Sequence, residues 1–255
     1  KANSSCGILF SFNNGSLKIT DSSIVNNTLY PSSGYSPLGG IGFLGDELII
    51  QDSEIINNDG GGVYISAAVS VLATNTEFTD NGGIGVEIKG IYYGSNYYEK
   101  ADLYLTNCSL NGNAGDGLNI QNAENVLIKK SNFNSNVGQG LFITDGTVMI
   151  EESIFEHNED KGICNIANSN LLTLRNNIIQ FNNEDGVYNS SGGCLIMDNC
   201  TVMRNGVSGS GNGLKSQYDD CVATVTNSVI DSNAGRGVSY SSDNSLYIVG
   251  TDIIN

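Results

Sequence analysis

Acidic residues recur in the turns of this chain and are the first candidates for chemistry. Asp116, Glu159, Asp160, Glu184 and Asp185 lie near corresponding points of segments that follow one another, so we expect them to gather near one corner of the fold. Oxygen-rich clusters of this kind can hold Ca²⁺, and the alternative is a set of solvated turn charges. A calcium site therefore stays open, and no other metal or cofactor is expected.

Residues suited to acid–base catalysis are few and scattered. The single histidine, His157, occupies a Glu-His-Asn turn in which Asn158 is expected to point inward, so His157 should point to solvent. The only Asp-Asp pair is Asp219-Asp220. Three arginines occupy different positions in their segments and should not converge: Arg175, Arg204 and Arg236. Because proton transfer needs groups within hydrogen-bond reach of one another, we expect no catalytic residue.

Nine asparagines mark a repeat that extends along the whole chain. Each follows a small or polar residue by five positions and an apolar residue by three, as Asn136 follows Ser131 and Phe133. The spacing is mostly 22 to 24 residues, the period of a solenoid coil. The anchors are Asn27, Asn58, Asn81, Asn113, Asn136, Asn158, Asn182, Asn205 and Asn233.

Apolar residues alternate within each repeat. Val126 and Ile128 precede Asn136, and Leu141 and Ile143 follow it. A period of two indicates short strands, and 32 Gly with only two Pro suit tight turns. The sequence therefore predicts one domain, residues 1–255, of about ten coils stacked at the strand spacing of about 4.8 Å.

This combination of period, strands and anchors resembles the right-handed parallel β-helix of the pectate-lyase-like superfamily over essentially the whole chain. The resemblance implies an all-β solenoid with an internal asparagine ladder, in which anchor amides bond to turn backbone and to the next anchor. A weaker likeness is to the Phe-x-x-Asn repeats of chlamydial polymorphic outer-membrane proteins. It rests on residues 78–81, 133–136 and 155–158, and the companion Gly-Gly-Ala element is missing.

The resemblance also implies what an active site would contain. Enzymes of this superfamily cut acidic polysaccharides with paired carboxylates, or with a Ca²⁺ cluster and a basic proton acceptor. The polygalacturonase-like set of Asn-Thr-Asp, Asp-Asp, Gly-His-Gly and Arg-Ile-Lys is absent, and so is the Asp-Pro-His-Glu of alginate epimerases. We therefore expect a non-enzymatic protein. The alternatives are a polysaccharide lyase or hydrolase, and carbohydrate binding without cleavage.

Two features are predicted to make contacts. The outward strand position is apolar in five successive coils, which would form a strip marking an interface, unless inserted loops or a neighbouring chain cover it. This apolar strip is Ile49, Leu72, Tyr104, Leu127 and Met149, and Thr173 and Ile196 continue its column. An insertion at residues 90–100 carries a tyrosine cluster suited either to binding sugars or proteins or to folding back over the strip. Its members are Tyr92, Tyr93, Tyr97 and Tyr98.

A second outward column, two residues further along, carries alternating charges. Its central members are Lys129, Glu151, Arg175 and Asp198. This pattern predicts a surface ion-pair ladder that sets coil register more than it supplies stability.

Charge and cysteine content restrict the partners and the compartment. A net charge of −16 with 11 basic residues argues against nucleic acid and anionic membrane surfaces, and no stretch is apolar enough to insert into a membrane. Cys108 and Cys200 share the small-residue column and should be buried thiols. Cys194 and Cys221 lie at nearly the same offset in neighbouring coils, which allows a disulfide. We expect an extracellular or cell-surface location.

The two ends of the chain are nearly in phase. Asn3 fits the anchor pattern, and Asn255 falls one residue short of the next anchor. Copies could therefore stack head to tail into a fibre, and a segment of a longer solenoid is the alternative. Together these observations predict a rigid stalk, adhesin or fibre element that contacts a protein partner or itself through the apolar strip or the chain ends.

Overall fold

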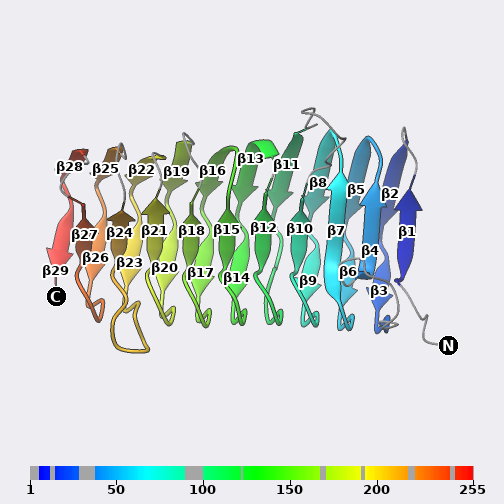
Figure 1. The fold of residues 1–255 in the computed structure, drawn as a ribbon, viewed down its shortest axis with the longest axis horizontal. Helices are drawn as coiled ribbons and strands as arrows, with labels where there is room; N and C mark the ends of the chain where they lie inside the picture. Colours follow the sequence, from blue (N-terminus) through cyan, green and yellow to red (C-terminus); the bar gives the residue numbers. More distant parts are fainter. Residues whose placement is uncertain are drawn as a thin grey trace.

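A computed structural model describes residues 6–11, 15–28, 38–89, 100–121, 123–166, 171–190, 193–217, 222–241 and 245–254. The described residues form 29 strands and no helix. The strands stack along one axis into an elongated body with the two termini at opposite ends (Figure 1). This is the solenoid that the repeat predicts.

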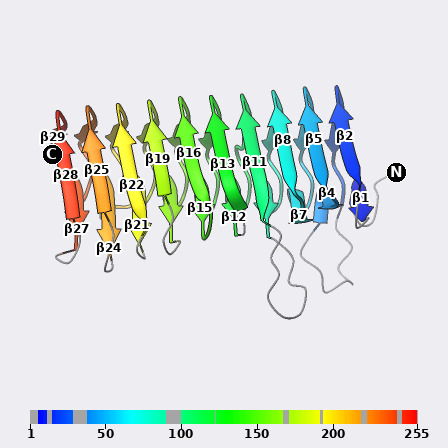
Figure 2. The ribbon, with the colours of Figure 1, turned by 90° about the horizontal axis from the view of Figure 1, so that it is seen from above.

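Two of the sheets contain ten parallel strands each. Sheet A consists of β1 (Ile8–Ser11), β4 (Leu38–Leu44), β7 (Gly61–Ala67), β10 (Val86–Ile88), β12 (Leu118–Ile120), β15 (Leu141–Ile143), β18 (Ile163–Asn165), β21 (Val187–Ser190), β24 (Leu214–Gln217) and β27 (Val238–Tyr240). Sheet B consists of β2 (Ser16–Thr20), β5 (Glu47–Gln51), β8 (Ser70–Thr74), β11 (Ala101–Thr106), β13 (Ala123–Lys129), β16 (Thr147–Glu151), β19 (Leu171–Arg175), β22 (Cys194–Asp198), β25 (Val222–Thr226) and β28 (Ser245–Val249). Figure 2 shows the strands of sheet B side by side along the body.

The third sheet, sheet C, is built from shorter strands in two runs. The first run is β3 (Ser23–Val25), β6 (Glu54–Ile56) and β9 (Glu77–Thr79). The second is β14 (Asn132–Asn134), β17 (Ile154–Glu156), β20 (Ile178–Gln180), β23 (Thr201–Met203), β26 (Val229–Asp231) and β29 (Asp252–Ile254). Ser109 bridges the two runs, because it pairs with Glu77 on one side and Asn132 on the other. Each coil thus contributes one segment to each sheet.

The core is a set of columns, because parallel pairing in register places like residues above one another. Val86, Leu118 and Leu141 of sheet A follow each other in one column and are 2% exposed or less. In sheet C, the rings of Phe133 and Phe155 stack with their centroids 4.5 Å apart. Burial of these side chains between three sheets supplies the main driving force for folding, at roughly 1.5–3 kcal/mol for each large side chain.

Sharp corners end many strands of sheets B and C. The residue after a sheet B strand has a positive φ, as in Asp52 (49°) and Lys130 (50°), and the residue after a sheet C strand does the same, as in His157 (56°). Asn and Asp tolerate this left-handed conformation better than other non-glycine residues, and they occupy many of these corners. The corners turn the chain so that all three sheets face one core.

The nine anchor asparagines form the predicted ladder inside the corner between sheets C and A. All nine are 8% exposed or less. Asn136 illustrates the pattern: its Nδ2 donates to Asn158 Oδ1 (3.0 Å) and to the carbonyl of Leu110 (2.9 Å), while its Oδ1 accepts from the backbone N–H and Nδ2 of Asn113. The ladder therefore satisfies backbone groups that the corner would otherwise leave without partners.

A second polar column lies at the corner between sheets B and C. The backbone N–H of Ser131 donates to Ser153 Oγ (3.1 Å), and the backbone N–H of Cys108 donates to Ser131 Oγ (3.1 Å). Cys108 and Cys200 are 1% and 2% exposed, which confirms the prediction of buried thiols. Burial raises the pKa of both thiols to about 11.

Candidate functional site

The outward side chains of sheet A form a column of aromatic and hydrogen-bonding groups. Register pairs each member with the next along the body. The members are Tyr64, Glu87, Asn119, Phe142, Cys164, Tyr188, Lys215 and Ser239, and we call this set the sheet A column. Because inward neighbours such as Val86 and Ile88 fill the core, the alternation of the strand sends these side chains to the opposite surface.

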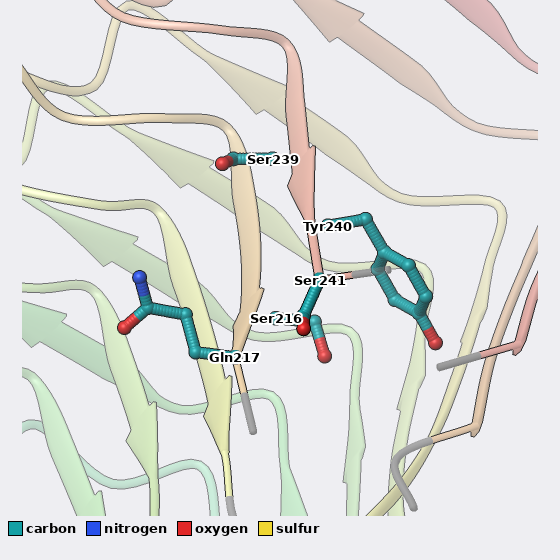
Figure 3. Close-up of a pocket in the computed structure, with 5 residues that line it drawn as sticks. All are labelled: Ser216, Gln217, Ser239, Tyr240 and Ser241. Atoms are coloured by element: carbon teal, nitrogen blue, oxygen red, sulfur yellow. The ribbon is translucent and has the colours of Figure 1, made fainter. Parts of the chain in front are cut away.

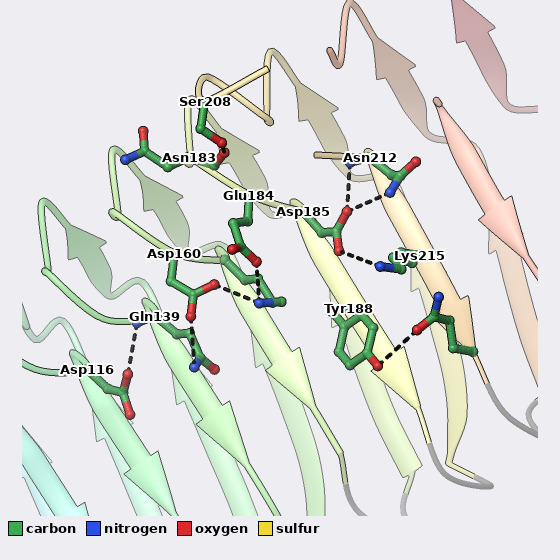
Figure 4. Close-up of polar contacts among 12 residues, drawn as sticks. Asp116, Gln139, Asp160, Asn183, Glu184, Asp185, Tyr188, Ser208, Asn212 and Lys215 are labelled. Atoms are coloured by element: carbon green, nitrogen blue, oxygen red, sulfur yellow. Dashed lines mark hydrogen bonds and ion pairs between the residues drawn. The ribbon is translucent and has the colours of Figure 1, made fainter. Parts of the chain in front are cut away.

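Polar residues in the turns that precede the strands of sheet A line one side of this column (Figure 4). Asp116 Oδ1 accepts from the backbone N–H of Gln139 (2.8 Å), and its Oδ2 accepts from Asn119 Nδ2 (3.0 Å). Gln139 Nε2 donates to Asp160 Oδ2 (3.3 Å). Successive coils are thus connected by hydrogen bonds along the turn edge.

Two lysines flank Tyr188 within this surface. Lys161 Nζ lies 5.8 Å and Lys215 Nζ 5.5 Å from the centroid of the Tyr188 ring, which places a cation near the ring from two neighbouring coils. The hydroxyl of Tyr188 donates to Gln217 Oε1 (3.3 Å). Lys215 Nζ also lies 3.9 Å from Asp185 Oδ2. These contacts hold the Tyr188 ring in one orientation.

Lys161 is the most strongly bound cation of the group. Its Nζ lies 2.7 Å from Asp160 Oδ1 and 2.5 Å from Glu184 Oε2. Burial alone would lower the pKa of Lys161, but the two carboxylates outweigh it and raise the pKa above the usual value. Lys161 is therefore a fixed positive charge.

Two carboxyl groups near the other end of this surface are poorly solvated. Burial raises the pKa of Glu87 and of Asp116 above the usual values, although Lys89 Nζ lies only 3.6 Å from Glu87 Oε1. Close to them, Asn119 Oδ1 and Gln139 Oε1 are buried and accept no hydrogen bond from the protein. Two buried acceptors thus lie beneath this part of the surface.

The predicted calcium cluster does not form within the described residues. Asp160 and Glu184 lie close together because both form ion pairs with Lys161 Nζ. Asp185 is bound by Asn212, whose backbone N–H and Nδ2 each donate to it at 2.7 Å. No group of three or more His, Cys, Asp or Glu side chains able to hold a metal ion occurs in the part of the chain that the structure describes. The turn carboxylates serve as hydrogen-bond acceptors and ion-pair partners.

His157 is exposed, as predicted. It lies at the corner after β17, where its ring stacks on Phe181 with the centroids 5.1 Å apart. Arg204 lies over the same Phe181 ring at 5.5 Å. Arg175 lies in sheet B and Arg236 in the turn before β27, so the arginines do not converge. His157 and the arginines therefore do not join the sheet A column.

The apolar strip predicted on sheet B is in register along five coils but less exposed than expected. Pairing places Ile49, Leu72, Tyr104, Leu127 and Met149 in one column. Tyr104 is 36% exposed and the other four are half-buried, because neighbouring coils shield each side chain. Thr173 continues the column in register, as expected, but it is only 4% exposed, whereas Ile196 is 38% exposed.

The predicted ion-pair ladder is present beside the strip. Lys129 Nζ lies 2.9 Å from Glu151 Oε2, and Arg175 Nη1 lies 3.8 Å from Glu151 Oε1. In the same column, Asp198 Oδ1 accepts from the hydroxyl of Thr226 (2.6 Å). Hydrogen bonds from Thr226 and Asn227 lower the pKa of Asp198.

Several predictions concern residues outside the described ranges. They are the tyrosine cluster of Tyr92, Tyr93, Tyr97 and Tyr98, the pair Asp219-Asp220, and the end positions Asn3 and Asn255. Cys221 also lies outside these ranges. Cys194, its partner in the possible disulfide, is exposed and has a free thiol in the described part of the structure, and the possible disulfide lies outside the described residues. Leu195 pairs with Ala223, so the residue in register with Cys194 is Val222.

The sheet A column was not predicted, although the repeat contains the pattern that identifies it. The positions five and seven residues after an anchor are the inward ones, and the position between them points outward. Around Asn136 these positions are Leu141, Phe142 and Ile143. The outward residue is Tyr64, Phe142 or Tyr188 in three of the coils, and only an inspection of the residues between the apolar ones would have identified this set.

The fold and the outward-facing surfaces define a parallel β-solenoid protein with a polar and aromatic column along one sheet. The family model described as the right handed beta helix region matches residues 6–179 and, in a second overlapping match, residues 90–253. The chain therefore belongs to this family. A search of curated proteins gave no match.

Solved structures with the same fold include proteins that act on polysaccharides. The A-module of an Azotobacter vinelandii mannuronan C-5 epimerase is 14% identical with a TM-score of 0.67, over 97% of this chain and 76% of that one. A double mutant of a periplasmic alginate epimerase is 15% identical with a TM-score of 0.68, over 92% of this chain and 62% of that one. A pectate lyase is 13% identical with a TM-score of 0.53, over 99% of this chain and 78% of that one. At these identities the likeness is one of fold.

No helix in the described part of the chain is long and apolar enough to cross a membrane.

Proposed function

We propose that this protein binds an extended glycan along the sheet A column and does so without cleaving it. The observation that carries the proposal is the composition of the column. Half-buried aromatic rings at Tyr64, Phe142 and Tyr188 are interspersed with hydrogen-bonding side chains such as Glu87 and Lys215. Rigid aromatic surfaces beside fixed polar groups suit a sugar, which has apolar ring faces and a rim of hydroxyls.

The spacing of the sheet supports this assignment. Neighbouring coils lie about 4.8 Å apart, which is close to the length that one pyranose unit occupies in an extended glycan. Phe142 and Tyr188 are two coils apart in the pairing of β15, β18 and β21. A glycan lying along the body would therefore meet equivalent positions at each successive sugar.

The charges of the surface favour a neutral glycan. Lys161 is bound by Asp160 and Glu184, and Asn119 and Gln139 each present an acceptor oxygen that has no protein donor. Hydroxyl groups of a neutral sugar are suitable donors for these acceptors. A polyanion would also be repelled by the net charge of −16.

Binding without cleavage is supported by the dispersal of acid–base groups. His157 stacks on Phe181 at a corner after sheet C, away from the outward face of sheet A. Within the described ranges, Lys161 is held by two carboxylates, which keeps it protonated and unsuited to act as a base. An extracytoplasmic location is part of the proposal, and the periplasmic alginate epimerase with this fold supports it.

The test compares two aromatic substitutions on different sheets. Affinity electrophoresis in gels containing mannan, β-glucan, alginate or polygalacturonate should show retardation by a neutral polymer, and Tyr188→Ala should abolish it. Tyr104→Ala is the matched control, because Tyr104 is an exposed tyrosine on the outward face of sheet B, and it should leave retardation unchanged.

Two results would contradict the proposal. One is equal retardation of wild type and Tyr188→Ala in every polymer. The other is release of new reducing ends or unsaturated products from any of the four polymers, which would make the protein a hydrolase or lyase.

The apolar strip on sheet B supports a second function, that of a rigid scaffold contacting a protein partner or a second copy. The observation in its favour is the register of five apolar residues on one face, which a solvated sheet would not need. Leu127→Asp should then disturb assembly measured by light scattering while the circular dichroism spectrum is retained. Val137→Asp, at an exposed apolar residue in a turn, is the control and should have no effect.

A further inference from the structure

We propose that a hydroxyl-lined pocket at one end of the sheet A column binds the terminal sugar unit of the glycan. The inference rests on the proposed function and adds a direction to it, because the glycan would then have one end fixed in the pocket. The pocket has a volume of about 370 Å³ and is lined by Ser216, Gln217, Ser239, Tyr240 and Ser241 (Figure 3). These residues come from β24, β27 and the position directly after β27.

The pocket lies where the inward face of sheet A changes its chemistry. From β7 to β15 the second inward position of each sheet A strand is a buried isoleucine, as in Ile120 and Ile143, and in β1 and β4 it is a phenylalanine. In the following coils the same column continues with Asn165, Asn189 and Ser216. Each of these polar side chains is 1% exposed or less. The exchange of a branched apolar side chain for serine removes volume and adds a polar atom at the pocket.

Ser216 is the residue whose environment indicates a ligand. It is 1% exposed, and its hydroxyl has no hydrogen-bond partner in the protein. A buried hydroxyl without a partner is unfavourable, and native proteins rarely retain one without a reason. A sugar hydroxyl entering the pocket would supply that partner.

The chemistry of the lining selects the class of ligand. All five lining residues carry uncharged hydroxyl or amide groups, each able to donate and accept. The hydroxyl of Tyr240 is itself positioned by donating to the carbonyl of Ser245. None of the described lining residues is charged, and this part of the lining suits a neutral pyranose better than a uronate or a phosphorylated sugar.

The pocket is continuous with the sheet A column. Ser239 belongs to both, because it is in register with Lys215 and Lys215 with Tyr188. Tyr188 also contacts the lining directly, through the hydrogen bond from its hydroxyl to Gln217 Oε1. Ser216 and Tyr240 are inward residues, so a glycan lying over Tyr188 and Lys215 would enter the pocket past the ends of β24 and β27, in the next coil.

The experiment measures calorimetric affinities for neutral hexasaccharides, mannohexaose and cellohexaose, each in free form and with both terminal units permethylated. Wild type should bind one free hexasaccharide and bind its permethylated-end form more weakly. Ser216→Leu, which fills the pocket, should lower the affinity for the free form by about tenfold or more, as expected for a site built to bond a hydroxyl. It should leave the affinity for the blocked form unchanged.

A second variant separates loss of the pocket from loss of the fold. Ser241→Leu narrows the pocket from a half-buried position and should have the same selective effect. Equal affinities of wild type and both variants for the free form, with binding still dependent on Tyr188, would overturn the pocket and leave the proposed function standing. Absence of binding to every probe by wild type, in the gels as well as in calorimetry, would overturn both.

Discussion

Two of the rows of buried polar side chains inside this solenoid, the anchor ladder and a shorter row in sheet A, differ in how completely they are hydrogen-bonded. In the anchor ladder, Asn136 uses both its donor and its acceptor, and the pattern recurs at the other anchors. In the shorter row of Asn165, Asn189 and Ser216, Asn165 Nδ2 donates to Asn189 Oδ1 (2.7 Å), but the row ends in a hydroxyl without a protein partner.

A buried polar row whose hydrogen bonds are all made within the protein can serve structure, and a row with an unpaired group can serve recognition. The anchor ladder meets the needs of the backbone at a corner that every coil repeats, so its loss would be costly. The short row lies on a strand whose backbone is already paired within sheet A. Its polar groups therefore serve the backbone at one described point, the Gly193 carbonyl, which accepts from Asn189 Nδ2.

The largest expected effect comes from breaking the anchor ladder. Asn136→Ala would leave the Leu110 carbonyl and the backbone N–H and Nδ2 of Asn113 without their partners. We expect a loss of about 3 kcal/mol in the free energy of unfolding, measured by chemical denaturation. Asn134→Ala, two residues away on the half-buried surface of sheet C, is the control. A neutral result at Asn136 would mean that the ladder is dispensable.

A smaller effect on stability is expected in the row of Asn165, Asn189 and Ser216. A single substitution there should destabilise the protein, and a double substitution that restores the apolar column should not. Asn189→Ala removes the acceptor of Asn165 and the donor to the Gly193 carbonyl, and should cost about 1–3 kcal/mol. The double variant Asn165→Ile with Asn189→Ile restores the apolar column of earlier coils and should be near neutral or stabilising. Denaturation midpoints of the single and double variants test this. A double variant that is less stable than the single variant would show that the row is needed for folding.

A third prediction concerns a polar group at the surface of sheet A. Because burial raises the pKa of Glu87, folding favours its protonated form. Its contribution to stability is therefore complete below the unfolded value of about 4.3 and is lost as the pH rises through the higher folded value. Glu87→Gln should gain stability relative to wild type between about pH 4 and neutral pH, in thermal unfolding across that range. A constant difference across the range would show that Lys89 compensates fully for burial.

The smallest effect is expected in the column that contains Cys200. Other members of this column, such as Ser131, Ser153 and the adjacent Ser228, accept hydrogen bonds from the backbone, and sulfur is a weaker acceptor than oxygen. Cys200→Ser should therefore raise the free energy of unfolding by about 0.5 kcal/mol. Cys164→Ser, at a buried thiol of the sheet A column and outside the column of Cys200, should not. A loss at Cys200 would indicate that the volume of sulfur matters more than hydrogen bonding.

The fold and the anchor ladder could be predicted from the sequence because both repeat in every coil, and repetition averages out local exceptions. The surfaces could not be predicted as well, because each depends on single residues. Thr173 follows four aliphatic residues and one tyrosine in the strip yet is buried, and the free thiol of Cys194 reflects a register that places it beside Val222. The pocket at Ser216 requires both a loss of side-chain volume and an unmatched hydroxyl, which only atomic packing reveals.

The corners of the coils have a consequence for how such a chain can change its length. Lys130 and Glu152 occupy the same left-handed corner in consecutive coils, with φ values of 50° and 53°, and Ser131 and Ser153 follow them in the same column. Removal of residues 131–152 would join Lys130 to Ser153 without a new turn, a new register or a change of face. Duplication of residues 131–152 would add one coil in the same way. Gene-level gain or loss of whole coils could therefore lengthen or shorten the sheet A column one sugar-sized step at a time.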